Sequence, residues 1–319
     1  MSVLTLSLSL VLFADPAPMP RHVGEAVELK TPTGTLFGVL ETPSTPPPWS
    51  AVMIHPGSGP TDRDGNNTQM QNDSLKLLGR VLREQGYAVL RIDKRGVGAS
   101  RKALKREEDA TIGLYAGDAA AWIDQLRKDP RISKVAFIGH SEGVLIGSLA
   151  GQTAKIDAFV SLCGAGRTYQ DVLREQLKKN LTKDMWGQAA PIIDQLEAGK
   201  TVKDPPKDLA ALFRHSVQPF LISAFRTDPA VALGKLTCPV LVVSGSTDIQ
   251  ISPADAKRLA ESRPGIRLVT IPNMCHVLKE VASRNRFDQL LKYMDPDVPL
   301  HPRMVAAVES FLKESLGGK

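Results

Sequence analysis

Three residues that lie far apart in the chain are of the types that carry out acyl transfer: Ser141, Asp248 and His276. A serine hydroxyl is a poor nucleophile at neutral pH, so it needs a general base within hydrogen-bond reach and a carboxylate that orients the base. The order serine, acid, histidine along the sequence suits such a triad. We therefore expect these three side chains to meet at one site.

The segment around Ser141 predicts a sharp turn between a strand and a helix. Residues 135–138 form a short apolar run typical of a buried parallel strand, and Ser141 follows within G-H-S-E-G (139–143). Glycines on either side of the serine let backbone pass close to the turn, which lifts the hydroxyl clear of the sheet. The alternative is a glycine-rich turn whose serine only caps the helix.

The acid and the base each follow an expected strand. Asp248 ends G-S-T-D (245–248), and His276 ends N-M-C-H (273–276). Because the carboxyl ends of parallel strands lie at one edge of a sheet, both side chains should lie at the same edge as Ser141. Taken singly, an aspartate after a strand is often a turn former and a histidine is often structural.

The other histidines are less well placed to be the base. His140 adjoins Ser141, but the sharp turn is expected to direct its side chain away from the serine. None of the remaining four follows the strand after the acid-bearing one: His22, His55, His215 and His301.

Acyl transfer also needs hydrogen-bond donors for a developing oxyanion. The backbone N–H of Glu142, just after the nucleophile and at the start of a helix, is one candidate. The second is expected from the glycine-rich loop after the strand at 51–54, and we assign it to the N–H of Ser58.

Strands and helices must alternate to position these loops, and the sequence predicts that they do. A hairpin at 25–30 and 35–40 is expected to open the domain. Further strands are expected at 51–54, 87–92, 135–138, 156–162, 240–243 and 267–271, and helices at 74–86 with Ser74 as N-cap, 111–129, from Ser252 onward, and 303–316.

The alternation breaks between residues 167 and 236, which contain amphipathic helical segments but no convincing strand. We interpret 21–166 and 237–319 as two parts of one α/β core and 167–236 as a helical cap over the carboxyl edge of the sheet. The cap aromatics are expected either to line a substrate pocket or to form the cap's own core: Trp186, Phe213, Phe220 and Phe225.

Composition favours a globular protein without a nucleic-acid partner. The formal charge of +6 arises from 40 basic and 34 acidic residues spread along the chain, so it indicates a solvated surface rather than a nucleic-acid site. The three cysteines, Cys163, Cys238 and Cys275, form no C-x-x-C pattern, and we expect free thiols and no metal site.

The N-terminal segment, 1–20, contains an uncharged apolar run at 3–14 followed by a proline-rich linker. The run is as long as the apolar region of a signal peptide and too short to span a bilayer. We expect export to the periplasm or the medium, although the missing basic residues and the Leu/Ser alternation also suit a strand in a cytoplasmic protein.

The chain resembles the α/β-hydrolase superfamily, and within it bacterial carboxylesterase-type hydrolases related to the serine aminopeptidase group. The segments that carry the resemblance are G-S-G-P-T-D-R-D-G-N (57–66), R-I-D-K-R-G-V-G-A-S (91–100), I-G-H-S-E-G (138–143), G-S-T-D-I-Q (245–250) and H-V-L-K (276–279).

By this resemblance, Ser141 is the nucleophile, Asp248 the acid and His276 the base, with the Ser58 and Glu142 amides as the oxyanion hole. The family implies a cofactor-free serine hydrolase that acts on small-molecule carboxylic esters, with short acyl chains expected. A peptidase, amidase or thioesterase of the same superfamily is the alternative. An inactive binding protein on this fold is the non-enzymatic alternative, and the oligomeric state is not predicted.

Charged residues cluster on two neighbouring loops: Arg63, Asp64, Asp93 and Arg95. They could bind a charged substrate group, but their balanced charges favour a buried ion-pair network that holds the loops together.

Overall fold

The computed structural model describes residues 24–317. The expected signal peptide and linker at 1–20 therefore lie outside the described residues. Within 24–317, no helix combines the length and the hydropathy that crossing a bilayer requires.

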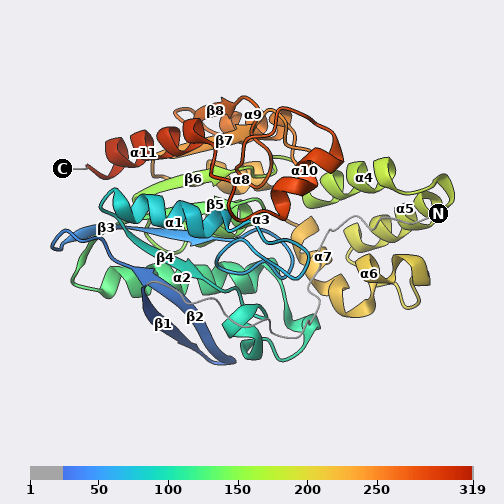
Figure 1. Ribbon diagram of the computed structural model, residues 1–319. Helices are drawn as coiled ribbons and strands as arrows, with labels where there is room; N and C mark the ends of the chain where they lie inside the picture. The colour runs from blue at the N-terminus through green and yellow to red at the C-terminus, as the bar shows by residue number, and fades with distance from the viewer. Residues whose placement is uncertain (1–23, 318–319) are drawn as a thin grey trace.

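A single eight-stranded sheet runs through the molecule in the order β1-β2-β4-β3-β5-β6-β7-β8 (Figure 1). The pairs β1–β2 and β2–β4 are antiparallel, and all other neighbours are parallel. The strands are β1 (Glu25–Thr31), β2 (Gly34–Glu41), β3 (Trp49–His55), β4 (Ala88–Ile92), β5 (Ile132–His140), β6 (Ala158–Leu162), β7 (Val240–Gly245) and β8 (Arg267–Ile271).

Helices cover both faces of the sheet, as the α/β-hydrolase fold requires. They are α1 (Ser74–Glu84), α2 (Ile112–Lys128), α3 (Glu142–Ala150), α4 (Tyr169–Asn180), α5 (Lys183–Glu197), α6 (Ala210–Phe213), α7 (Gln218–Phe225), α8 (Pro229–Gly234), α9 (Pro253–Glu261), α10 (Arg286–Tyr293) and α11 (Pro302–Leu316). Short 3-10 turns are η1 (Gly98–Ala103), η2 (Glu107–Asp109), η3 (Lys207–Leu209) and η4 (His215–Val217).

Two hydrophobic cores lie on opposite faces of the sheet, and alternate residues of a strand contribute to one or the other. In β5, Val135 and Phe137 pack with α2 and α3, whereas Ala136 and Ile138 pack with α1 and α11 on the opposite face. Because β5 is buried on both faces, its apolar run is continuous rather than alternating. The α/β-hydrolase fold class predicted from the sequence is confirmed.

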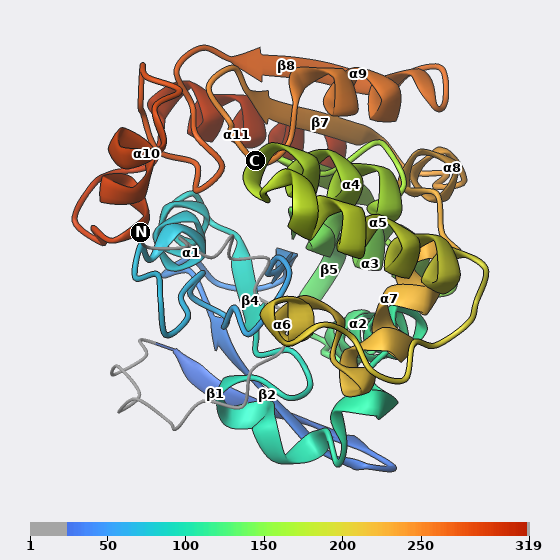
Figure 2. The same cartoon turned by 90° about the vertical axis from the view of Figure 1, so that its right-hand side faces the viewer.

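Every regular element within 167–236 is a helix, as the sequence analysis predicts. Helices α4 to α7 stand together at one end of the sheet (Figure 1) and lie in front of it when the molecule is viewed from that end (Figure 2). Helix α8 differs, because it contacts α3 and α9 beside the sheet.

Two local differences from the sequence analysis have clear causes. Ser74 is the first residue of α1 and not its N-cap, because the carbonyl of Asp64 accepts from the N–H groups of Leu75 and Lys76 and so satisfies the helix start. Helix α10 is an additional element that the sequence analysis does not identify. By contrast, Ser252 caps α9 as expected, within a capping box completed by Asp255.

Charged side chains of the loops after β3 and β4 form buried ion pairs, as expected for a structural network. Their partners include residues that the sequence analysis did not consider, on β2, β4 and α2. The pairs are Arg63–Asp93 at 2.5 Å, Arg91–Glu41 at 2.5 Å, Arg91–Asp64, and Arg95–Asp118 at 2.6 Å.

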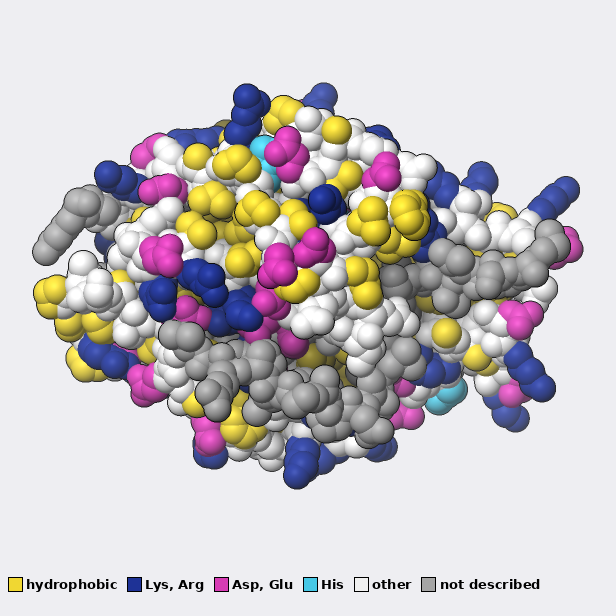
Figure 3. All heavy atoms as spheres, in the orientation of Figure 1, with side chains coloured by type: hydrophobic (Ala, Val, Ile, Leu, Met, Phe, Trp, Pro, Cys, Tyr) yellow, Lys and Arg dark blue, Asp and Glu magenta, His cyan; other side chains and the backbone are white. Residues whose placement is uncertain are grey.

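The three cysteines are free and buried. On the face shown in Figure 3, basic and acidic side chains are mixed rather than gathered into one basic area. This distribution agrees with the interpretation of the net charge as a property of the solvated surface.

Candidate active site

Ser141 lies at a strained turn between β5 and α3, with φ 55° and ψ −120°. A Cβ atom at Gly139 would lie 2.5 Å from the Gly143 carbonyl oxygen, and one at Gly143 would lie 2.5 Å from the His55 carbonyl oxygen. Only glycine therefore fits on either side of the turn. The Ser141 side chain makes no capping hydrogen bond to α3, which contradicts the alternative that the serine serves as a helix cap.

The structure brings Asp248 and His276 together at the same edge of the sheet. His276 Nδ1 lies 2.8 Å from Asp248 Oδ2, and both side chains are buried. Asp248 Oδ1 accepts from the backbone N–H groups of Gln250 at 2.7 Å and Ile251 at 3.0 Å. The carboxylate is thus held by backbone on one side and orients the imidazole on the other.

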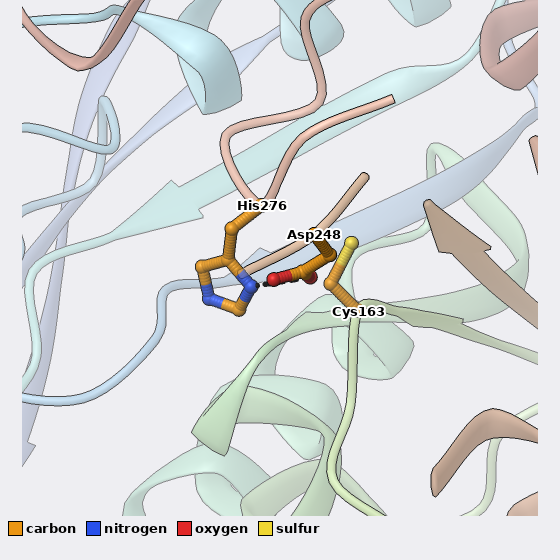
Figure 4. Close-up of side chains that lie close together, drawn as sticks. All are labelled: Cys163, Asp248 and His276. Carbon is orange, nitrogen blue, oxygen red and sulfur yellow. Dashed lines mark hydrogen bonds and ion pairs between the residues drawn. The ribbon is translucent and has the colours of Figure 1, made fainter. Parts of the chain in front are cut away.

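Cys163 follows β6 and places its thiol beside this pair (Figure 4). Its Sγ, an Asp248 carboxylate oxygen and a His276 ring nitrogen all lie within 4.8 Å of one another. Burial, and to a lesser degree the charge of Asp248, raises the pKa of the thiol well above its usual value. Because metal binding requires a thiolate and the 2.8 Å contact is of hydrogen-bond length, we interpret the cluster as a hydrogen-bonded Asp–His pair with a neutral thiol against it.

The ring of His140 packs against that of the candidate base, His276. The ring centroids of His140 and His276 are 4.9 Å apart, and His140 Nε2–H donates to the His276 carbonyl at 2.8 Å. The turn directs this side chain toward the His276 loop, which it supports. Burial lowers the pKa of His140 to about 4, so the ring is neutral near pH 7.

The loop after β3 passes close to the serine, as an oxyanion-hole loop must. A Cβ atom at Gly57 would lie 3.0 Å from Ser141 Cβ. The buried Lys94 ammonium donates to the carbonyl oxygens of Gly57 and, at 2.9 Å, Gly59. These two bonds hold the loop on both sides of Ser58. Ser58 and Glu142, the first residue of α3, line the same cavity.

Two cavities meet at Ser58 and Ser141. The larger holds about 650 Å³ of open space and extends under α4, with an apolar lining that includes Leu145, Val172, Leu173 and Ile251. The smaller, of about 540 Å³, extends past His140 and His276 toward Asn67 and Tyr293. Ser141 therefore borders both pockets.

Cap aromatics contribute to packing more than to the cavity wall. Phe213, Phe220 and Phe225 are buried in the main core, and none of them lines the larger cavity. The cap aromatic that does line it is Tyr169, whose ring packs edge-on against Phe220 with centroids 6.2 Å apart.

Sequence reasoning missed three residues of this site: Lys94, His140 in its supporting role, and Tyr169. A buried lysine has no local signal, because its bonds to Gly57 and Gly59 join segments more than thirty residues apart.

Comparison with known proteins agrees with the fold. Residues 72–218 match the family described as serine aminopeptidase, S33. A curated relative, Esterase EstD of Thermotoga maritima, is 23% identical over 249 residues, which are 76% of this chain and 58% of the relative. The chain thus spans little more than half the length of that relative.

Solved structures of the same architecture cover nearly the whole chain. Est1E from Butyrivibrio proteoclasticus, solved with ferulic acid, superposes with a TM-score of 0.60 at 20% identity, covering 92% of this chain and 100% of that one. The α/β hydrolase GrgF from a Penicillium species superposes with a TM-score of 0.61 at 16% identity, covering 92% and 99%. At these identities the likeness concerns the fold.

Proposed function

We propose that this chain, a member of the α/β-hydrolase superfamily, is a serine hydrolase that cleaves carboxylic esters through an acyl-enzyme. The observation that carries the proposal is the Asp248–His276 hydrogen bond of 2.8 Å at the cavity that Ser141 also lines. Ser141 is the proposed nucleophile, His276 the base and Asp248 the acid that orients it.

The proposed reaction begins when Ser141 Oγ attacks the carbonyl carbon of the ester and His276 Nε2 accepts the hydroxyl proton. Because Asp248 accepts from Nδ1–H, it fixes the tautomer that leaves Nε2 free and stabilises the imidazolium. The N–H groups of Ser58 and Glu142 are the proposed donors to the oxyanion.

Collapse of the tetrahedral intermediate breaks the ester C–O bond, and the leaving alkoxide takes the proton from His276 as the alcohol departs. Water then attacks the acyl-enzyme, gives its proton to His276, and a second collapse releases the acid and returns the proton to Ser141. Every proton is balanced between Ser141, His276, alcohol and water.

The names of similar proteins favour ester over amide substrates. EstD is named as an esterase, whereas the matched family takes its name from aminopeptidases. The apolar cavity beneath α4 suits the acyl part of a small ester, and we propose short acyl chains and the helices within 167–236 as the cap that selects them.

The test combines labelling with a substrate panel. A fluorophosphonate should label the parent at Ser141 and should not label Ser141→Ala. The parent should hydrolyse p-nitrophenyl acetate and butyrate faster than the corresponding thioester or aminoacyl-anilide. Labelling at another residue would contradict the nucleophile assignment, and faster cleavage of the anilide would favour a peptidase or amidase.

Export remains a separate proposal, which rests on the apolar run at 3–14. Protein recovered from the native cell should begin near Asp15 and fractionate outside the cytoplasm. Recovery from the cytosol with Met1 or Ser2 at the N-terminus would contradict it.

A further inference from the structure

The smaller cavity is the one that the alcohol part of the ester must enter. His276 lines this cavity and does not line the larger one. In the proposed reaction the departing alkoxide takes its proton from His276, so the alcohol oxygen has to lie within hydrogen-bond reach of that ring. The alcohol part therefore belongs in the smaller cavity and the acyl part in the larger, apolar one.

The lining of the smaller cavity is rich in polar side chains that carry no formal charge. None of the described residues that line it is a lysine, arginine, aspartate or glutamate, and burial lowers the pKa of His140 to about 4, so that ring is neutral near pH 7. Hydroxyl and amide groups come from Thr61, Asn67, Gln250 and Tyr293.

This lining disfavours two kinds of alcohol. A charged alcohol, such as choline, would leave water without finding an opposite charge on these walls. A purely apolar alcohol would displace the water around the amide and hydroxyl groups without replacing its hydrogen bonds. An uncharged alcohol with further hydroxyl groups avoids both costs.

Gln250 places an accessible amide at the junction of the two cavities. The residue is exposed, and it lines both cavities together with Ser58 and Ser141. Its backbone N–H donates to Asp248 Oδ1 at 2.7 Å, and its side-chain Nε2–H donates to Tyr293 Oη at 2.8 Å. Among the described residues, nothing donates to Oε1, so this oxygen is available to accept from a substrate hydroxyl group.

We propose that the smaller cavity binds an alcohol that carries further hydroxyl groups, so that the preferred substrates are esters of polyols or sugars with apolar acyl groups. Gln250 Oε1 accepts from one of these hydroxyl groups, and Tyr293 is the positioning residue that holds the Gln250 amide. This inference rests on the proposed function and narrows it: the apolar cavity selects the acid, and the polar cavity selects the alcohol.

The first test varies the alcohol while the acyl group stays butanoyl. The value of kcat/KM is measured for 2,3-dihydroxypropyl, propyl and choline butanoate, and each is divided by the ester's rate constant with hydroxide to remove the intrinsic reactivity of the leaving alcohol. The parent should prefer the dihydroxypropyl over the propyl ester about fivefold or more, which one or two hydrogen bonds supply. Gln250→Leu should reduce this ratio to about twofold or less, and Tyr293→Phe should reduce it in part.

The second test lets two alcohols compete for one acyl-enzyme. The enzyme cleaves p-nitrophenyl butanoate in glycerol and propan-1-ol at equal concentration. The alcohol oxygen attacks the acyl carbon, its proton passes to His276, and Ser141 Oγ leaves and takes that proton. The parent should form glyceryl over propyl butanoate about fivefold or more, above the roughly twofold excess that two primary hydroxyl groups give. Because both products arise from the same folded enzyme, partial unfolding of a variant does not change this ratio.

Gln195→Leu, the same change at an exposed position of α5, is the matched control and should keep both ratios. Equal corrected rates for the propyl and dihydroxypropyl esters in the parent, or unchanged ratios in Gln250→Leu, would overturn the inference while leaving the ester hydrolase intact. A preference for choline butanoate over both other esters would overturn it in favour of cation recognition. If no alcohol competes with water, the hydrolysis ratio decides alone. If the parent hydrolyses none of the esters and fluorophosphonate does not label Ser141, the proposed function itself fails, and this inference with it.

Discussion

The carboxyl edge of the sheet and the helices of the proposed cap, α4 to α7, are held by different kinds of contact. At the edge, backbone groups position the candidate residues: the Ser141 N–H donates to the Leu162 carbonyl at 2.9 Å, and the Asp248 carboxylate accepts from two backbone N–H groups. Within 167–236, hydrogen bonds made by side chains, rather than by backbone groups at strand ends, hold the helices in place. Gln218 bonds to both the N–H and the carbonyl of Val202, and Glu107 accepts from Arg214 across more than one hundred residues.

This difference predicts which substitutions should mainly change activity and which should mainly change stability. Residues at the sheet edge are placed by strand ends that persist when one of their side chains is changed, so substitutions there should affect chemistry more than folding. Residues of α4 to α7 are placed by side-chain packing against one another and against the main core, so substitutions of their buried side chains should affect stability first.

The largest expected effect is at the sheet edge. His276→Ala and Ser141→Ala should each lower kcat by about 10⁴ to 10⁶, and the double variant should lose little more, because the residues act as a unit. Thermal unfolding of the variants should remain close to that of the parent. If His276→Ala keeps more than about a tenth of the activity, a barrier change under ~1.4 kcal/mol, another residue is the base.

In helix α6, Phe213→Ala should lower the free energy of unfolding by about 3–5 kcal/mol, because the side chain is completely buried in the main core. Denaturant unfolding measures the loss, and Phe287→Ala is the control, since that ring on α10 is 69% exposed. A loss below about 1 kcal/mol for Phe213→Ala would show that the stability of these helices does not depend on the burial of this ring.

Acid should weaken the contact between His140, in the turn before α3, and the loop that carries His276. The pKa of His140 is lowered by burial to about 4, compared with 6.5 when unfolded, so the unfolded chain binds the proton more readily and stability falls as the pH drops from 6.5 to 4. The full contribution is about 3 kcal/mol.

His140→Gln keeps an N–H donor but cannot be protonated in this range, so its unfolding free energy should fall less with acid than that of the parent. Denaturant unfolding at several pH values measures the difference. Parallel curves for parent and variant would show that His140 does not contribute to the acid sensitivity.

The wall of the larger cavity should control chain length. Val172→Phe places a ring where an acyl chain is proposed to lie, so the ratio of kcat/KM for hexanoyl over acetyl esters should fall about tenfold or more. Val231→Phe, at an exposed position of α8, is the control of equal size. An unchanged ratio in Val172→Phe would place the acyl chain elsewhere.

The smallest effect contrasts two glycines in helices. Gly187 in α5 has nothing within 4 Å of an added Cβ, so Gly187→Ala should raise the unfolding free energy by about 0.5–1 kcal/mol. Gly147 in α3 is its counterpart against the sheet, where the added Cβ would lie 2.0 Å from the Phe137 ring, and Gly147→Ala should destabilise. Equal changes in the unfolding free energy for the two variants would contradict the difference in packing around Gly187 and Gly147.

Much of the sheet and the order of the candidate residues could be predicted, because both depend on local patterns. The apolar run before Ser141 and the glycines around it predict the turn, and the 2.5 Å approaches at Gly139 and Gly143 give the physical reason for those glycines. Likewise, strand ends predict that Asp248 and His276 share one edge, where they lie 2.8 Å apart.

The tertiary structure alone decided what surrounds these residues. Whether a cap aromatic faces the cavity depends on helix rotation against distant partners, which is why Tyr169 lines the cavity while Phe220 is packed behind it. Lys94 and His140 acquire their roles from carbonyl groups on other segments, those of Gly57 and His276. Glu142 is a further case: its place after the serine in the sequence predicts the role of its backbone amide, but only the folded chain shows that one of its carboxyl oxygens, Oε2, is buried without a hydrogen-bond partner among the described residues.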